Sequence, residues 1–317
     1  MKNQSSNHLF MIEPEVFYSN EQTADSNHYQ KNHDAELTKN DVKNKALKEF
    51  HGLKNKIEEN GIKVTSMKGI PECPDHIFPN WFITFEDKTF QLFSMKAVNR
   101  RLEKTKEMIE FLSINYSFNG DLTEYENKDL FLEATSSMVI DRVNMVVYAA
   151  ISSRTSSELA KKWCSDNNYE LVLFETESHK GDAIYHTDVF MYVGQKIIGI
   201  CFDVILPKYR QMVKEKVSRF HDIYEIEESQ ILDFCGNSLE ARNDSNEYFL
   251  IMSSRAFNTL NDGQKEKLSK YYKKIIHSDL TTIEKYGGGS ARCMLNELFY
   301  NFSTQLAVVL VPPSGKK

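Results

Sequence analysis

The residues of this chain that could do chemistry centre on a cysteine close to its C-terminal end. Cys293 follows the run Gly287-Gly288-Gly289-Ser290-Ala291-Arg292. Three glycines let the backbone approach a ligand closely, and Ser290 is a typical N-cap for a helix that would hold Cys293 in its first turn. The N–H groups of such a turn and the adjacent Arg292 favour a thiolate. The pattern predicts a nucleophile, although a buried structural cysteine beside a glycine turn has the same local sequence.

Two other segments carry groups that could assist a thiolate. His186 and Asp188 begin an apparent strand and would lie on one face of it, because strand side chains alternate. Glu133 stands among apolar and small residues, where an acid is either paired in the interior or faces water at a sheet edge. A thiolate, a histidine and two carboxylates are what addition to a planar CN3 or CN2O carbon needs: the thiolate attacks, the histidine moves protons and the carboxylates hold N–H groups.

The elements that must position these residues form a recurring unit of a strand pair, a helix and a further strand. Strands are predicted at 9–12, 62–67, 81–84, 90–93, 131–140, 145–150, 170–174, 183–193, 196–204, 230–234 and 248–253, and helices at 31–60, 99–112, 156–167, 208–219 and 263–277. About five such units fit the length, and no Pro/Gly/Ser linker separates them. We therefore expect one domain over residues 1–317, with short flexible ends at 1–8 and 313–317.

Composition limits the classes of function. The 317 residues are 41% hydrophobic and 26% charged, which is typical of a soluble globular protein. A net charge of −6 argues against a nucleic-acid surface. We find neither a signal peptide nor a membrane span and expect a cytoplasmic protein. Five scattered cysteines without a CxxC pair predict neither disulfides nor a zinc site, and nothing calls for a metal or cofactor. The oligomeric state stays open, a homo-oligomer included.

Taken together and in order, the motifs resemble the guanidine-modifying superfamily of arginine deiminases, dimethylarginine dimethylaminohydrolases and amidinotransferases. The resemblance is greatest to its bacterial citrulline-utilisation hydrolase (CtlX-like) branch and covers nearly the whole chain. The motifs are Pro14 with Phe17, Asn20, Thr23, Asn27 and Gln30, then Phe78-Pro79-Asn80-Trp81, Asn99-Arg100-Arg101, Leu132-Glu133, Asp141-Arg142-Val143-Asn144, Ser153-Arg154-Thr155, Tyr185-His186-Thr187-Asp188 and Gly287 to Met294. The fold that this resemblance implies is a five-bladed α/β propeller (pentein) of ββαβ modules around a central active site.

The resemblance also implies roles for particular residues. The catalytic residues would be Cys293 as nucleophile, His186 as general acid and base, and Glu133 and Asp188 as carboxylates that hold the planar nitrogens of the substrate. The α-carboxylate of an amino-acid substrate would be bound by Arg154, with Arg100 or Arg101 as a second candidate. Arginine suits that position because its guanidinium binds a carboxylate through two parallel hydrogen bonds.

The substrate prediction depends on Asn80. Arginine deiminases carry a Phe-Thr-Arg-Asp stretch whose acid helps to neutralise the guanidinium, whereas this chain has the amide of Asn80 in that stretch. A site with one anion fewer suits a neutral ureido group. We therefore expect hydrolysis of citrulline to ornithine, ammonia and carbon dioxide through a covalent Cys293 intermediate. The branch usually has two amide or acidic residues before the tryptophan, so Asp75 or Asp87 could supply the missing contact.

Other functions fit the same motifs. The rivals among enzymes are hydrolysis of arginine or dimethylarginine, and transfer of an amidino group. A non-catalytic propeller that acts as a binding module is a further alternative, but it would have no need of a nucleophile and a proton shuttle.

Overall fold

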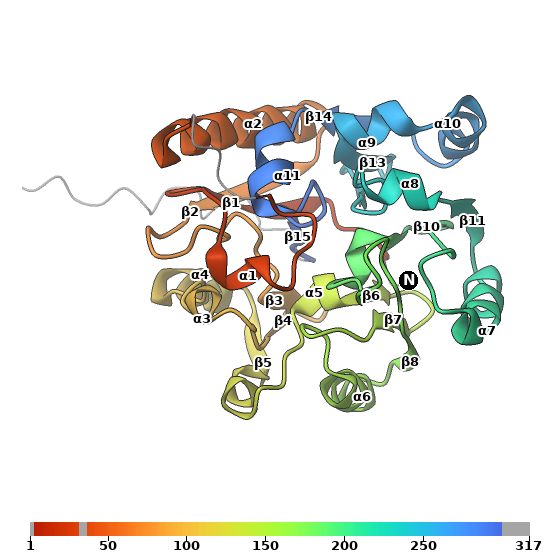
Figure 1. Ribbon diagram of the computed structural model, residues 1–317, viewed down its shortest axis with the longest axis horizontal. Coiled ribbons are helices and arrows are strands. Elements are labelled where there is room, and N and C mark those ends of the chain that lie inside the picture. The colour runs from red at the N-terminus through yellow and green to blue at the C-terminus, as the bar shows by residue number, and fades with distance from the viewer. Residues whose placement is uncertain (1–2, 32–36, 300–317) are drawn as a thin grey trace, which may run out of the picture.

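The computed structural model describes residues 3–31 and 37–299 of the chain. Five three-stranded sheets stand around a common centre, with the longer helices on the outside (Figure 1). The sheets are β15-β1-β2, β3-β4-β5, β6-β7-β8, β9-β10-β11 and β12-β13-β14. In each sheet the first pair of strands is antiparallel and the second pair is parallel. The predicted fold, a five-bladed α/β propeller of ββαβ modules, is confirmed.

The strands are short, as strands that fan out from a centre must be. Their bounds are β1 His8–Glu13, β2 Lys63–Lys68, β3 Phe82–Thr84, β4 Thr89–Leu92, β5 Ser117–Asp121, β6 Met138–Asp141, β7 Val146–Ala150, β8 Glu170–Phe174, β9 Met191–Val193, β10 Ile197–Ile200, β11 Asp222–Glu225, β12 Leu239–Arg242, β13 Tyr248–Ser253, β14 Lys274–Ser278 and β15 Asn296–Glu297. Because β15 pairs with β1, a strand from near residue 297 completes the first module and closes the ring.

Helices connect the central strand of each sheet to its parallel neighbour. The α-helices are α1 Glu21–Ala24, α2 Lys39–Glu59, α3 Val98–Arg101, α4 Lys106–Asn115, α5 Ala134–Ser137, α6 Ser157–Asp166, α7 Pro207–Ser218, α8 Glu228–Ile231, α9 Ser254–Thr259, α10 Asp262–Ser269 and α11 Thr281–Gly287, with 3-10 turns η1 Thr123–Lys128 and η2 Thr187–Val189. Helix α2 shows the logic: Thr38 and Asp41 form a capping box, and Val42, Phe50 and Leu53 lie on its buried stripe.

Several predicted elements are wrong in type or extent. Residues 230–234 are the end of helix α8 and a following turn rather than a strand, and the predicted helix 263–277 divides into α10 and β14. The helix expected at 99–112 is broken, because Thr105 caps a new helix by accepting a hydrogen bond from the N–H of Met108. Strands β5, β11, β12 and β15 were not predicted. Short apolar stretches fit both helix and strand, and pairing with neighbours decides between the two.

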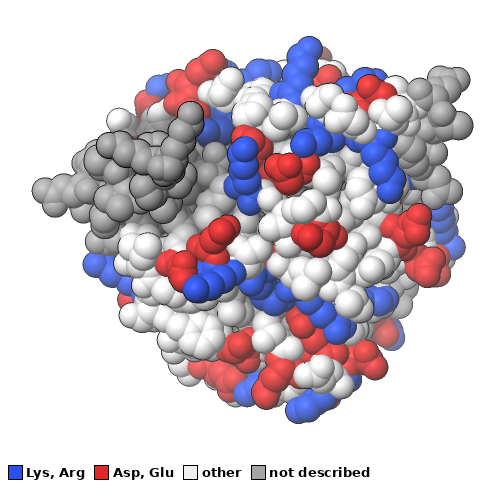
Figure 2. Space-filling view, turned by 90° about the vertical axis from the view of Figure 1, so that its left-hand side faces the viewer, with Lys and Arg blue, Asp and Glu red and all other residues white. Residues whose placement is uncertain are grey.

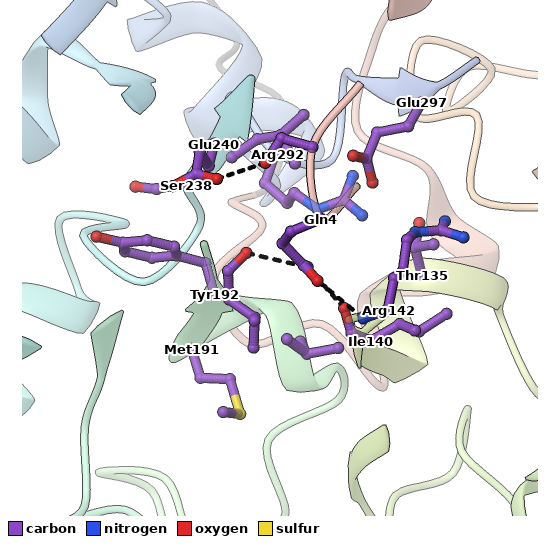
Figure 3. Close-up of a pocket in the computed structure, with 14 residues that line it drawn as sticks. Gln4, Thr135, Ile140, Arg142, Met191, Tyr192, Ser238, Glu240, Arg292 and Glu297 are labelled. Atoms are coloured by element: carbon purple, nitrogen blue, oxygen red, sulfur yellow. Dashed lines mark hydrogen bonds between the residues drawn. The ribbon is translucent and has the colours of Figure 1, made fainter. Parts of the chain in front are cut away.

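The N-terminal segment is held at the centre of the ring. Gln4, Ser5 and Ser6 are buried. Gln4 Nε2 donates to the carbonyl of Ile140 at 2.8 Å, and Ser5 Oγ donates to Glu240 Oε1 at 2.5 Å. Figure 3 shows Gln4 in a cavity that strands of several modules surround. The predicted flexible end at 1–8 is therefore wrong for residues 4–8, whereas 313–317 lie outside the described residues.

On the side of the molecule drawn in Figure 2, basic and acidic side chains are interspersed. None of the helices in the described ranges is long and apolar enough to cross a membrane.

Candidate active site

Most of the predicted site residues meet at one small pocket. Its lining consists of Asn27, Asp75, Phe78, Asn80, Arg100, Arg154, Tyr185, His186, Gly287, Gly289 and Cys293. Glu133 and Asp188 lie behind this lining, since Glu133 binds His186 and Asp188 contacts Cys293. The free space is about 20 Å³, which is little more than the room that one water molecule needs.

Cys293 lies in a turn rather than in a helix. Helix α11 ends at Gly287, and residues 291–294 form a single turn in which the N–H of Met294 donates to the carbonyl of Ser290 at 3.3 Å. Ser290 Oγ donates to Glu284 Oε1 at 2.7 Å, so it does not cap a following helix. The predicted helix around Cys293 is wrong, and a helix dipole does not act on the thiol.

The thiol of Cys293 is buried and close to an acid. Burial raises its pKa, and the charge of Asp188 raises it further. Asp188 Oδ2 is 3.7 Å from Sγ. Asn237 and Arg292 act in the opposite direction but do not outweigh these effects. Cys293 is therefore a neutral thiol in the structure as it stands, not the thiolate that the sequence indicated.

His186 and Glu133 form a buried pair. His186 Nε2 lies 2.8 Å from Glu133 Oε2. Burial opposes the charge of Glu133, but Arg154, His186 and Arg100 outweigh it and hold the pKa of this carboxyl well below its usual range. Burial, together with the charge of Arg154, lowers the pKa of His186, although the hydrogen bond and the charge of Glu133 raise it. An ionised carboxylate only accepts hydrogen bonds, so neutral His186 carries its proton on Nε2 and leaves Nδ1 unprotonated.

The strands predicted around Glu133 and around His186 are not formed at these residues. Thr187–Val189 is the 3-10 turn η2, and Thr187 Oγ1 ties it to the carbonyl of Ser137 at 2.7 Å. Glu133 immediately precedes helix α5, where Ala134 takes a positive φ of 42°. The side chains still converge on the pocket because both turns lie at the inner ends of neighbouring sheets. Strand alternation is not the cause.

The predicted substrate-binding arginines differ in their surroundings. Arg154 donates to Ser26 Oγ at 2.7 Å, and its Nη1 is 3.7 Å from Glu133. Arg100 is paired with Glu103 and also donates to Asn80 Oδ1 at 2.6 Å. Both arginines line the pocket. Arg101 does not, since its guanidinium binds the carbonyl of Met95 at 3.1 Å.

Both ends of the Asn80 amide are occupied. Its Oδ1 accepts from Arg100, and its Nδ2 donates to Ser136 Oγ at 3.1 Å. Of the two acids considered as helpers, Asp75 lines the pocket, while Asp87 lies in the exposed β3–β4 turn and binds Thr89. Asp75 Oδ1 is buried and has no hydrogen-bond partner among the residues described.

Asn237 was not predicted to be part of the site. Its Nδ2 lies 3.2 Å from Sγ of Cys293. The signal that could have found it is the run Cys235-Gly236-Asn237, in which a glycine precedes a polar residue between two modules. The described residues contain no group of three His, Cys, Asp or Glu side chains that could hold a metal ion.

Comparison with solved structures relates this fold to arginine-metabolising enzymes. The N-terminal domain of ArgZ, an arginine dihydrolase from the ornithine–ammonia cycle in Cyanobacteria, is similar in a cysteine-to-serine variant bound to substrate, with a TM-score of 0.72 and 16% identity over 92% of this chain and 98% of that one. A dimethylarginine dimethylaminohydrolase adduct with S-methyl-L-thiocitrulline is also similar. Its TM-score is 0.60 and its identity 14%, over 94% of this chain and 100% of that one.

AgrE in complex with ornithine and NAD⁺ gives a TM-score of 0.71 and 17% identity, over 91% of this chain and 39% of AgrE. At these identities the similarity shows the fold. A search of curated proteins finds no match.

The family follows from the sequence model that matches this chain. Residues 13–300 match the model described as N,N dimethylarginine dimethylhydrolase, eukaryotic. The citrulline-utilisation branch is not singled out by this match and stays a prediction. The chain belongs to the N,N dimethylarginine dimethylhydrolase family of C–N hydrolases and, with it, to the guanidine-modifying pentein superfamily.

Proposed function

We propose that the protein hydrolyses a C–N bond of the guanidinium group of arginine or a methylated arginine, with Cys293 as nucleophile. The observation that carries this proposal is a set of buried acceptor atoms around the thiol. Asp75 Oδ1, Asp188 Oδ1 and His186 Nδ1 are buried and have no hydrogen-bond partner within the described part of the chain. A guanidinium is a cation with several N–H donors and could satisfy such acceptors. A ureido group is neutral and has fewer N–H donors than the guanidinium of arginine.

A cationic substrate would also explain how a neutral thiol becomes a nucleophile. Burial and Asp188 keep the pKa of Cys293 high. A guanidinium bound beside Sγ would offset the charge of Asp188 and lower that pKa, so that the thiolate forms more readily in the complex than in the free protein. The proton of the thiol would pass to Nδ1 of His186, whose Nε2 proton is held by Glu133.

The reaction would then proceed in two steps. Sγ forms a bond to the guanidino carbon, and the C–N bond to the departing amine breaks as His186 returns the proton to that nitrogen. Water, deprotonated by His186, adds to the same carbon, and the C–S bond breaks to release a ureido product and the free thiol. From arginine the products are citrulline and ammonia; from dimethylarginine they are citrulline and dimethylamine.

Hydrolysis of citrulline to ornithine, ammonia and carbon dioxide is the second candidate. The specific observation in its favour is that Asn80, which lines the pocket, adds no charge to it. Arg100 and Arg154 line the pocket as well, and exchange of their present partners for the substrate would allow either arginine to bind an α-carboxylate.

One assay separates these candidates. The purified protein is incubated in turn with arginine, dimethylarginine and citrulline, and citrulline, ornithine, ammonia and dimethylamine are measured. Citrulline from arginine or dimethylarginine supports the first candidate, and ornithine from citrulline supports the second. Cys293→Ala should abolish either reaction, whereas Cys164→Ala, at another buried cysteine, should not. Absence of turnover with all three compounds would contradict both.

A further inference from the structure

Asn237 is a buried amide that touches the reacting sulfur, although the mechanism above does not use it. The side chain is 1% exposed. Nδ2 lies 3.2 Å from Sγ of Cys293 and donates to the carbonyl of Asp188 at 3.1 Å. Oδ1 accepts from the N–H of Ser290 at 3.2 Å and from the N–H of Cys293 at 3.3 Å. One side chain thus joins the cysteine turn to the turn that carries Asp188.

These contacts determine which end of the amide faces the sulfur. If the amide were rotated by half a turn, its NH2 group would face two backbone N–H donors and its oxygen would face the carbonyl of Asp188. Neither pairing is a hydrogen bond. The backbone therefore requires the N–H end of Asn237 to point at Sγ.

The local chain is built to bring this amide close. Phe234 takes a left-handed φ of 61°, and the N–H of Asn237 donates to the carbonyl of Phe234 at 2.9 Å. A Cβ on Gly236 would lie 2.4 Å from the carbonyl oxygen of Val189, so only glycine permits this approach to the chain after Asp188. The position of the Asn237 side chain therefore depends on the short segment between α8 and β12.

The sulfur needs such a donor because burial and the nearby Asp188 oppose a negative charge on it, and Arg292 does not outweigh them. Cys293 is buried, and the carboxylate of Asp188 is 3.7 Å away. A hydrogen bond to an ionised group is stronger than one to a neutral group, so an N–H that points at Sγ stabilises the thiolate more than the thiol.

We propose that Asn237 is a catalytic residue: its side-chain N–H stabilises the thiolate of Cys293, orients Sγ beside Asp188 and so sets the pH range in which Cys293 is nucleophilic. The effect on turnover rests on the proposed function. The effect on the thiol does not, because it precedes any contact with substrate.

The test removes the NH2 group of Asn237, which faces Sγ, and keeps the oxygen that accepts from the backbone. Asn237→Asp has nearly the same shape, retains an oxygen for the two backbone N–H groups, and places a second oxygen opposite Sγ. Alkylation of Cys293 by iodoacetamide is followed against pH by mass spectrometry of its peptide. We expect the rate near neutral pH to fall on the order of tenfold, and the profile to move to higher pH. With a turned-over substrate, kcat should fall by a similar factor while KM changes little.

A matched control separates this effect from a structural one. Asn243 also accepts from two backbone N–H groups, those of Ser245 and Glu247, and its Nδ2 donates to the Glu247 side chain. Asn243→Asp should leave the alkylation profile of Cys293 unchanged. Should Asn237→Asp not fold, Asn237→Ser removes the amide without adding a charge and should show a smaller shift of the same sign.

Two results would overturn the proposal: an unchanged alkylation profile in a folded Asn237 variant, or equal shifts in the Asn237 and Asn243 variants. Absence of turnover by the unmodified protein would count against the proposed function alone, because alkylation needs no substrate.

Discussion

At the scale of single residues, burial controls the protonation states of the site. Burial raises the pKa of Cys293 and lowers that of His186, so both are uncharged at neutral pH. Glu133 stays ionised because Arg154, His186 and Arg100 surround it. Under the proposed function, His186 can accept a proton without further change, and Cys293 becomes a nucleophile once a cation lies beside it.

Glu133→Gln should lower kcat by at least about a hundredfold, because the amide no longer holds the Nε2 proton of His186 as a carboxylate does. It should also reduce the free energy of unfolding by about 3 kcal/mol, since the buried Arg154 loses its anionic partner. Steady-state kinetics and urea unfolding measure the two effects.

Glu126→Gln is the control, because Glu126 pairs with Lys104 and Arg101 at a neighbouring loop and does not contact His186. A stable Glu133→Gln protein with unchanged kcat would contradict a role for Glu133 in orienting the histidine.

At the scale of elements, a glycine turn that packs against residues 20–31 positions Cys293. Asn27 Nδ2 donates to the carbonyl oxygens of Gly287 and Gly288 at 3.0 and 3.2 Å. Gly288 has a φ of 61°, and a Cβ there would lie 2.5 Å from the backbone nitrogen of Gln30. The turn and the segment can therefore pack together only with glycine at this position.

Gly288→Ala should reduce stability by about 1–2 kcal/mol through the left-handed conformation alone. It should also lower kcat about a hundredfold, because the clash displaces the turn that holds Cys293. Thermal unfolding and kinetics check the two effects. Gly263→Ala, in helix α10, should instead stabilise the protein by about 0.5–1 kcal/mol. Full activity of Gly288→Ala would mean that the turn does not set the position of the thiol.

At the scale of the whole molecule, five separate sheets are joined at their centre by buried polar contacts. Glu240 of β12 accepts hydrogen bonds from Ser5 of the N-terminal segment and from the N–H of Gln195, which follows β9. Burial raises the pKa of Glu240 to about 7, although these hydrogen bonds oppose the shift. One of the groups that join the modules is thus a carboxyl group that is partly protonated near neutral pH.

The pH dependence of stability follows from this shift. Between its unfolded pKa of about 4.5 and its folded pKa of about 7, Glu240 binds a proton in the folded state that the unfolded chain has released. Stability from this group is therefore present at low pH, is lost as the pH rises through this window, and levels off above it. The loss is at most about 3 kcal/mol.

Glu240→Gln cannot titrate and should flatten the fall of the unfolding free energy between about pH 5 and pH 8, measured by urea unfolding. Part of the slope should remain, because the pKa of Glu284 is also raised to about 7 by burial. Glu266→Gln, at an exposed position, should leave the slope unchanged. An identical slope in Glu240→Gln and the unmodified protein would exclude Glu240 as its source.

The sequence by itself determined what depends on local pattern. The apolar stripe of α2 and the alternation of strand pairs with helices predicted the modules, because these periods follow from backbone geometry. The motifs around Cys293, His186 and Glu133 predicted which residues would meet. Local pattern failed where short apolar stretches fit helix and strand equally, as at 230–234.

Only the tertiary structure decided how those residues are arranged. Glu133 and His186 are 53 residues apart in the chain, and Asn237 and Cys293 are 56 apart, yet each pair is in contact. Packing of neighbouring modules brings Glu133 to His186, and closure of the ring by β15 brings Cys293 to Asn237, and no local signal encodes such distances. Burial between the modules removes water from Cys293, so the site holds a neutral thiol where the sequence indicated a thiolate.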